Sequence, residues 1–117
     1  MTLTERRVGD VTLLDLAGRL VFDEGDAELR DRVNDLVAQG RLKIVVNLRD
    51  VTYMDSCGVG VLIAKYVSVR QKGGNVKLLH LTSRSHRVID ICGLEKIFEA
   101  FDSEEAAVMS FATAQKA

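Results

Sequence analysis

The fold of this chain is decided by the stretch Thr52-Tyr53-Met54-Asp55-Ser56-Cys57-Gly58-Val59-Gly60-Val61-Leu62. A β-rich run stops at Ser56 beside Asp55, and an apolar pattern typical of a helix begins at once. We therefore expect Ser56 where a strand ends and a helix starts, with its hydroxyl near free backbone N–H groups. Such a place suits a serine that caps a helix, and it also suits a serine that carries a phosphate.

The length, composition and charge of the chain favour some classes of protein and argue against others. A chain of 117 residues predicts one domain, and 47% apolar with 28% charged residues is typical of a globular protein. The net charge of −1, with dispersed Lys and Arg, argues against a nucleic-acid or membrane-surface partner. No apolar run is long enough for a membrane span or signal core, which predicts a cytoplasmic location. We expect Cys57 and Cys92 to be small buried side chains, without a disulfide or metal site.

Apolar periodicity outward from the central stretch predicts alternating strands and helices. The expected strands are Leu3 to Val8 and Val11 to Ala17, joined as a hairpin and ended by Gly18, then Leu42 to Leu48, Val76 to Leu81 and Ile97 to Glu99. The expected helices are Asp26 to Gln39, Ser56 to about Lys72, Ser83 to Cys92, and a last helix capped by Asp102.

This order predicts the α/β class. Helices that join successive strands imply a small, mixed but largely parallel sheet, with an antiparallel edge from the first hairpin and about four helices packed on it. We expect residues 1–117 to form this single domain.

Signatures of catalysis are weak in this sequence. It has no Gly-x-Ser-x-Gly elbow, no phosphate loop and no paired histidines for zinc. Gly58-Val59-Gly60 starts a dinucleotide fingerprint, but Ile63 stands where the third glycine belongs. We expect His80, in a strand, and His86, in a helix, to be structural or solvated. The sequence therefore predicts a protein that is not an enzyme and needs no cofactor or metal.

The pattern Val51-Thr52-Tyr53-Met54-Asp55-Ser56-Cys57-Gly58-Val59-Gly60-Val61-Leu62 resembles the signature of bacterial anti-sigma factor antagonists, the stand-alone STAS-domain proteins. The resemblance extends over the whole chain and predicts the STAS-like fold. It includes Gly18 after the second strand, the turn Lys72-Gly73-Gly74, and Ile91-Cys92-Gly93-Leu94 before Ile97-Phe98.

The resemblance implies a partner switch. In that family the unphosphorylated antagonist binds an anti-sigma factor that is a serine kinase, and so frees the sigma factor. The kinase phosphorylates the serine after the aspartate, which corresponds to Ser56, and the complex dissociates. A metal-dependent serine phosphatase then resets the antagonist.

One segment departs from the family pattern. The family reads Gly-Glu-apolar-Asp at the end of the second strand, and this chain reads Gly18-Arg19-Leu20-Val21, followed by Asp23. The change to Arg19 implies a different partner surface or a different kinase. We expect the partner-binding residues to be Asp55, Ser56, Cys57, Gly58, Arg19 and Asp23.

Two other functions remain open from the residues. The chain could be a constitutive interaction subunit of the same fold in a transport or signalling complex, with Ser56 only a cap or a contact. It could also be an enzyme or a small-molecule sensor that uses the helix start at Gly58 and Gly60 for a nucleotide. The sequence identifies neither the sigma factor nor the oligomeric state.

Overall fold

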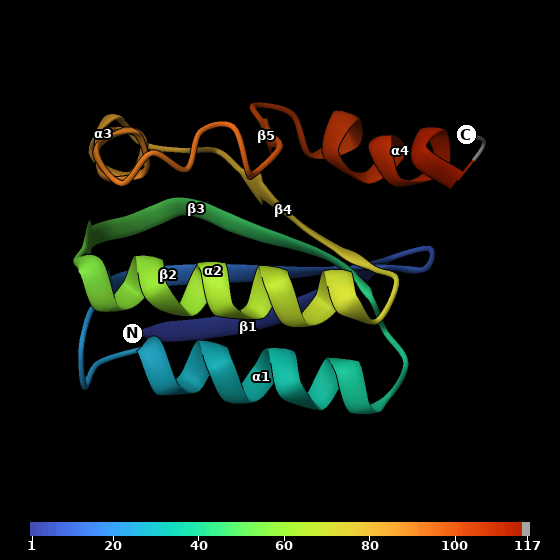
Figure 1. The fold of residues 1–117 in the computed structure, drawn as a ribbon, viewed down its shortest axis with the longest axis horizontal. Helices are drawn as coiled ribbons and strands as arrows, with labels where there is room; N and C mark the ends of the chain where they lie inside the picture. The colour runs from blue at the N-terminus through green and yellow to red at the C-terminus, as the bar shows by residue number, and fades with distance from the viewer. Residues whose placement is uncertain (116–117) are drawn as a thin grey trace.

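The computed structural model describes residues 1–115, with the side chains of residues 1–112, so the last two residues of the expected domain lie outside the described part. Within that part, five strands form one sheet in the order β1-β2-β3-β4-β5 (Figure 1). The strands are β1 (Thr2–Val8), β2 (Val11–Leu20), β3 (Lys43–Met54), β4 (Asn75–Leu79) and β5 (Ala100–Phe101). The helices are α1 (Asp26–Ala38), α2 (Ser56–Gln71), α3 (Ser83–Ile91) and α4 (Glu104–Gln115).

The strand directions confirm the expected topology. β1 pairs antiparallel with β2, and β2-β3, β3-β4 and β4-β5 pair in parallel. Each parallel connection passes through a helix, because the chain must return to the starting edge of the sheet before the next strand can begin. The result is the mixed α/β sheet with an antiparallel edge that the sequence predicts.

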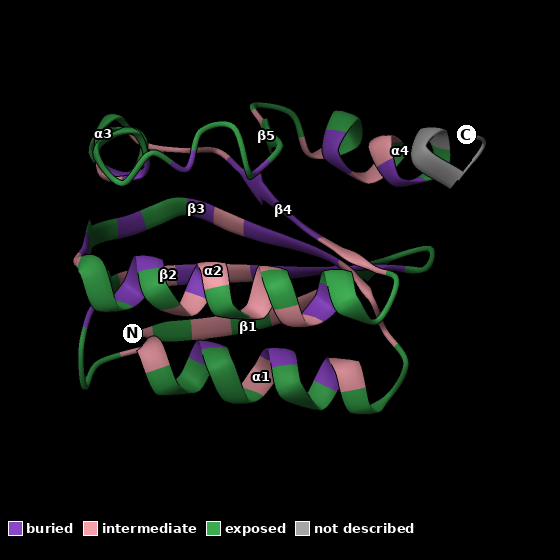
Figure 2. Cartoon of the chain, in the orientation of Figure 1, coloured by how far each residue is buried: buried purple, intermediate pink, exposed green. Residues whose placement is uncertain are grey.

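The sheet has an apolar layer on each face, as the alternation along β3 shows. Ile44, Val46 and Leu48 belong to a core with α1 and α2, whereas Val45 faces a smaller core that includes Phe111 of α4. β3 and β4 are buried over much of their length, while β1 at the edge is more exposed (Figure 2). A strand covered on both faces explains the continuous apolar run in the sequence of β3.

Two irregularities bend the pairing of β2 and β3 near their carboxyl ends. The register shifts between Asp15 and Ala17 and again between Gly18 and Arg19, so β3 gains an unpaired residue each time. Gly18 adopts a φ of 105°, a region that favours glycine. The prediction that the strand stops at Gly18 is wrong: β2 passes through Gly18, opposite a bulge in β3, and continues to Leu20. The same pairing extends β3 to Met54, beyond the predicted end at Leu48.

Two further predictions are wrong. Residues 97 and 98 lie in a turn and a bend, and the last strand is Ala100–Phe101. The segment before this strand is held on the core by the buried side chains of Leu94 and Phe98. Cys57 and Cys92 are both exposed, because they lie at the outer surface of the first turn of α2 and at the C-cap of α3.

Candidate partner-binding site at the start of helix α2

Asp55, and not Ser56, caps helix α2. Asp55 has an extended backbone with φ −105° and ψ −176°, and its Oδ1 accepts a hydrogen bond of 3.0 Å from the backbone N–H of Gly58. Ser56 is the first residue of the helix. The expectation of a strand-to-helix junction is correct. Of the two roles that the sequence leaves open for Ser56, the structure rules out the helix cap, because the carboxylate one residue earlier already accepts from the Gly58 N–H.

The same carboxylate holds the loop between β2 and α1. Asp55 Oδ2 accepts a hydrogen bond of 3.2 Å from the backbone N–H of Phe22, and the N–H of Asp55 donates to the carbonyl of Leu20 at 3.4 Å. The pKa of the Asp55 carboxyl is lowered, mainly by the bond from Gly58 and further by the bond from Phe22. One ionised side chain therefore fixes two segments that are distant in the sequence.

Gly58 is buried and makes the close approach of this loop to α2 sterically feasible. A Cβ at position 58 would overlap the carbonyl oxygen of Leu20 and lie 3.0 Å from its Cγ. The role of Gly58 is therefore to let β2 and α2 pack together, and it presents no side chain to a partner. Gly60, two residues later, has open space around it.

Ser56 is exposed at the positive end of the α2 dipole. Within residues 1–115, no protein group forms a hydrogen bond with its Oγ. Cys57 beside it is also exposed. The hydroxyl at this helix start is thus accessible to an enzyme or a binding partner.

The loop after β2 presents an aromatic side chain and a carboxylate close to Ser56. Val21 and Glu24 exchange two backbone hydrogen bonds of 3.0 and 3.1 Å, which turn the chain tightly at Phe22 and Asp23. Phe22 is 63% exposed, and Asp23 is exposed with a φ of 61°. The end of β3, the start of α2, this loop and α3 all lie at one end of the molecule, at the left in Figure 1.

Arg19 lies opposite Tyr53 in the β2-β3 ladder and covers its ring. The Cζ of Arg19 is 5.7 Å from the centre of the Tyr53 ring, and the Cζ of Arg84 on α3 is 5.6 Å from it. Both distances suit cation–π interactions. Arg19, predicted as a partner-binding residue, is exposed beside the junction and stacks on an aromatic residue of the central stretch.

Part of the surface at this end of the molecule was not predicted from the sequence. Arg84, Arg87 and Ile91 lie on one face of α3, together with Val88, and line a hollow with Tyr53 and Met54. Their spacing of three and four residues is the signal that could have found them. The exposure of Phe22 follows from the turn geometry, which no sequence pattern reveals.

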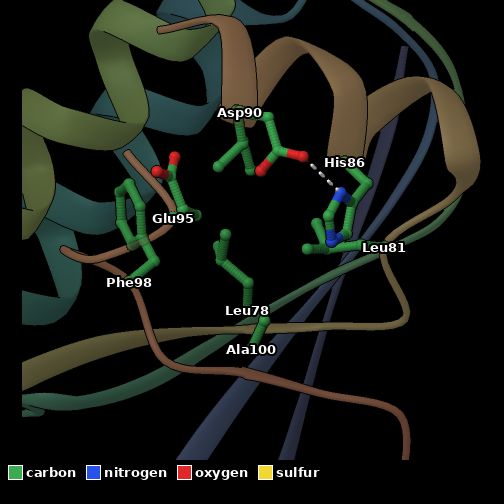
Figure 3. Close-up of a pocket in the computed structure, with 8 residues that line it drawn as sticks. Leu78, Leu81, His86, Asp90, Glu95, Phe98 and Ala100 are labelled. Carbon is green, nitrogen blue, oxygen red and sulfur yellow. Dashed lines mark ion pairs between the residues drawn. The ribbon is translucent and has the colours of Figure 1, made fainter. Parts of the chain in front are cut away.

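A separate cavity of about 250 Å³ lies between α3 and the β4-β5 edge of the sheet. Figure 3 shows His86 and Asp90 at its rim, with His86 Nδ1 3.0 Å from Asp90 Oδ2. Both side chains belong to α3 at i,i+4 spacing and are largely exposed, which is typical of an ion pair on a solvated helix face. His80 follows β4, and its Nε2 lies 3.5 Å from Arg49 Nη2.

This fold and its exposed helix-start serine define a class of domain, and the comparison with family models gives its name. The model of the STAS domain matches residues 3–107. The chain therefore belongs to the STAS domain family. Among the described residues, no helix is long and apolar enough to cross a membrane.

The relatives define the branch of the family. The anti-sigma-B factor antagonist of Bacillus subtilis (strain 168) is 38% identical over 80 residues, which cover 68% of this chain and 72% of that protein. The anti-sigma F factor antagonist of Paenibacillus polymyxa is 30% identical over 99 residues, 84% of each chain. The phosphorylated form of the Bacillus cell fate determinant SpoIIAA has the same fold, with a TM-score of 0.75 and 21% identity over 94% of this chain and 99% of that chain. The protein thus resembles regulatory anti-sigma factor antagonists in sequence and SpoIIAA in fold.

Proposed function

We propose that this protein is an anti-sigma factor antagonist that works by partner switching. The unphosphorylated form binds an anti-sigma factor with serine kinase activity and frees the sigma factor. Phosphorylation of Ser56 abolishes binding, and a serine phosphatase restores it. The protein acts through binding and is not itself an enzyme.

The observation that carries this proposal is that the structural hydrogen bonds at the start of α2 are made by Asp55 and not by Ser56. Asp55 caps α2 and fixes the β2-α1 loop, while the neighbouring hydroxyl of Ser56 is exposed and has no hydrogen bond to lose among the described residues. A kinase can modify such a serine without unfolding the helix start. The named relatives are anti-sigma factor antagonists, and one structure of the same fold is of a phosphorylated protein.

A phosphate on Ser56 has enough charge to switch an interface off. It adds about 1.5 to 2 negative charges. Repulsion from a partner carboxylate about 5 Å away costs roughly 1 to 6 kcal/mol, between water-like and surface-like dielectric constants. This range corresponds to about tenfold to ten-thousandfold in affinity.

The surface around Ser56 supplies contacts for a partner. Phe22, Asp23, Cys57 and Arg19 are exposed within the same end of the molecule, and Asp55 holds the loop that carries two of them. An aromatic side chain with polar neighbours is typical of the centre of a protein interface. We assign the partner-binding surface to these residues and Ser56.

The test is a pulldown from cells of the source organism with the wild-type protein, Ser56→Ala and Ser56→Asp. We expect the wild type and Ser56→Ala to capture an anti-sigma factor of the serine kinase type, and Ser56→Asp to lose it. The captured kinase, given ATP, should phosphorylate the wild type at Ser56 and leave Ser56→Ala unmodified, as mass spectrometry of the peptide would show.

Ser68→Asp is the matched control, because it adds the same charge to the same helix three turns away from Ser56. We expect it to bind like the wild type. Equal capture by wild type and Ser56→Asp, together with unchanged binding of the phosphorylated protein, would reject the switch. A transporter or assembly subunit as the stable partner would instead favour the constitutive interaction subunit.

A further inference from the structure

A hollow between the end of β3 and helix α3 adjoins the residues assigned to the partner-binding surface and has no contact assigned to it in the proposed function. This arginine groove has a volume of about 490 Å³ and is lined by Tyr53, Met54, Ser83, Arg84, Arg87, Val88 and Ile91. Ile91 is 77% exposed and Tyr53 is 44% exposed. Large apolar side chains so exposed at a hollow are typical of a docking surface.

The charge of the groove is of one sign. Arg84 and Arg87 line it, and Arg19 lies over the ring of Tyr53 at its edge. Among the side chains that the structure describes, no carboxylate lies within ion-pairing distance of these three guanidinium groups. Three unpaired arginines together contrast with the net charge of −1 of the chain.

Two acidic residues close to the groove are bonded to other groups. Asp55 accepts hydrogen bonds from the N–H groups of Gly58 and Phe22, and Asp90 of α3 pairs with His86 at 3.0 Å. Among the described side chains, none of these carboxylates is paired with Arg19, Arg84 or Arg87, so the three guanidinium groups are free to pair with carboxylates of a partner. An ordered arginine stacked on an aromatic ring loses less conformational freedom on pairing with a carboxylate than a mobile one does.

The groove is continuous with the proposed phosphorylation site. Tyr53 and Met54, which line it, directly precede Asp55 and Ser56 in the chain. A partner that covers Ser56 would extend across the groove. Because of this continuity, the partner that binds at Ser56 in the proposed function is also the occupant expected in the groove.

We propose that the arginine groove binds an acidic segment of the anti-sigma factor, with one large apolar side chain packed against Tyr53 and Ile91 and with carboxylates paired to Arg19, Arg84 and Arg87. The inference rests on the proposed function and specifies the partner's surface. It explains how a phosphate at Ser56 would weaken the complex: the phosphate would repel the partner's carboxylates and compete with them for the arginines. Charge complementarity of this kind also selects the partner.

The test measures the affinity of purified protein for the anti-sigma factor that the wild type captures. Arg87→Glu is compared with Arg30→Glu, which makes the same charge change at an exposed position of α1. We expect Arg87→Glu to weaken binding by about tenfold or more, and Arg30→Glu by less than about twofold. The loss should shrink as salt rises from about 0.01 M to 0.15 M, because the Debye length falls from about 30 Å to about 8 Å.

A second pair of variants tests the apolar anchor. Ile91→Ala is compared with Val67→Ala, since both residues are exposed and neither truncation opens the core. We expect about a tenfold loss with Ile91→Ala and no loss with Val67→Ala. Circular dichroism melting curves should be the same for all four variants.

The outcomes separate this inference from the proposed function. Binding that Ser56→Asp abolishes, but that Arg87→Glu and Ile91→Ala leave unchanged, would overturn the groove's role and keep the switch. Nucleic acid retained by the wild type and lost with Arg87→Glu would also overturn it. If the wild type captures no anti-sigma factor, both the proposed function and the proposed role of the groove are rejected.

Discussion

The carboxylate of Asp55 accepts a hydrogen bond from the backbone N–H of Phe22, 3.2 Å away and 33 residues earlier in the chain. Its other oxygen caps α2 through Gly58 at 3.0 Å. The start of α2 and the loop that presents Phe22 are therefore held in one arrangement by one side chain. The shape of the proposed interface depends on this residue more than on Ser56.

Asparagine at position 55 should separate the two roles. In Asp55→Asn the side-chain oxygen still caps Gly58, but the amide nitrogen cannot accept the Phe22 hydrogen bond, whereas Asp55→Ala loses both. We expect Asp55→Ala to lose about 1 kcal/mol or more of unfolding free energy, and Asp55→Asn to lose less. Amide exchange at Phe22 should accelerate in both variants. Unchanged protection of that amide in Asp55→Asn would show that the loop does not depend on the second bond.

Two glycines of α2 should respond in opposite directions to the same substitution. Gly58→Ala would push a methyl group into the carbonyl of Leu20, and we expect a loss of about 1 to 3 kcal/mol of unfolding free energy. Gly60→Ala meets open space and should gain up to about 1 kcal/mol, because alanine favours the helix. Urea unfolding of the two variants checks this. A similar effect at both positions would mean that the close approach at Leu20 is not the constraint.

Acid should weaken the contact between β1, β2 and α4. The Arg6 guanidinium donates to Asp15 Oδ1 at 3.1 Å and to Glu104 Oε1 at 2.7 Å, and it holds the pKa of both carboxyls below their usual values. Because these pKa values are lower in the folded than in the unfolded chain, the stabilisation is complete above the usual values of about 4 and is lost as pH falls through the folded values.

Arg6→Met should reduce the dependence of the unfolding free energy on pH in the acid range. Because Arg6, Asp15 and Glu104 are partly exposed, we expect Arg6→Met to lose no more than about 1 kcal/mol of unfolding free energy at pH 7. Below about pH 4.5 its unfolding free energy should fall less steeply with pH than that of the wild type. Arg30→Met, which removes an exposed arginine 3.7 Å from Asp31, is the control and should follow the wild-type curve. If the unfolding free energies of wild type and Arg6→Met fall in parallel with pH, the Arg6 contacts with Asp15 and Glu104 do not cause the loss of stability in acid.

The order of elements and the strand-to-helix junction could be predicted from the sequence, because apolar periodicity and β-branched runs report burial directly. The capping residues could not. Asp55 caps α2 although Ser56 was the candidate that the sequence offered, and Ser103, whose Oγ accepts from the N–H of Ala106 at 3.2 Å, caps α4 where Asp102 was expected. In both places two adjacent polar residues can cap, and the backbone conformation that decides between them is set by tertiary contacts.

The surface of the candidate site was the other part that the sequence did not reveal. Ser56 was predicted as a site residue from the family motif, and Arg19 from the departure of this chain from that motif. The arginine groove, in contrast, depends on α3 lying beside the end of β3. That juxtaposition brings Arg84 next to Tyr53, 31 residues earlier. Short-range patterns contain no information about such a contact, although they place Arg84, Arg87 and Ile91 on one helix face.

Lys77 tests whether a buried charge stabilises the second core. Its side chain is 1% exposed; its Nζ lies 2.8 Å from Ser110 Oγ, 3.5 Å from Glu99 Oε2 and 4.4 Å from the centre of the Phe111 ring. Methionine at position 77 would keep the unbranched stem of the side chain. The two polar partners of Lys77 would not be left without one, because Ser110 Oγ still donates to the carbonyl of Ala107 and Glu99 is largely solvated. We therefore expect Lys77→Met to change the unfolding free energy by less than about 1.5 kcal/mol.

Lys77→Ala provides the contrast, because it removes the stem as well as the charge. The space left between β4 and Phe111 should cost about 2 to 4 kcal/mol, as for other large-to-small changes in a core. Urea unfolding at pH 7 measures both variants against the wild type. A loss in Lys77→Met as large as that in Lys77→Ala would show that the ammonium group, through Ser110 and the aromatic ring, holds α4 on the sheet; a small loss means that packing of the stem does so.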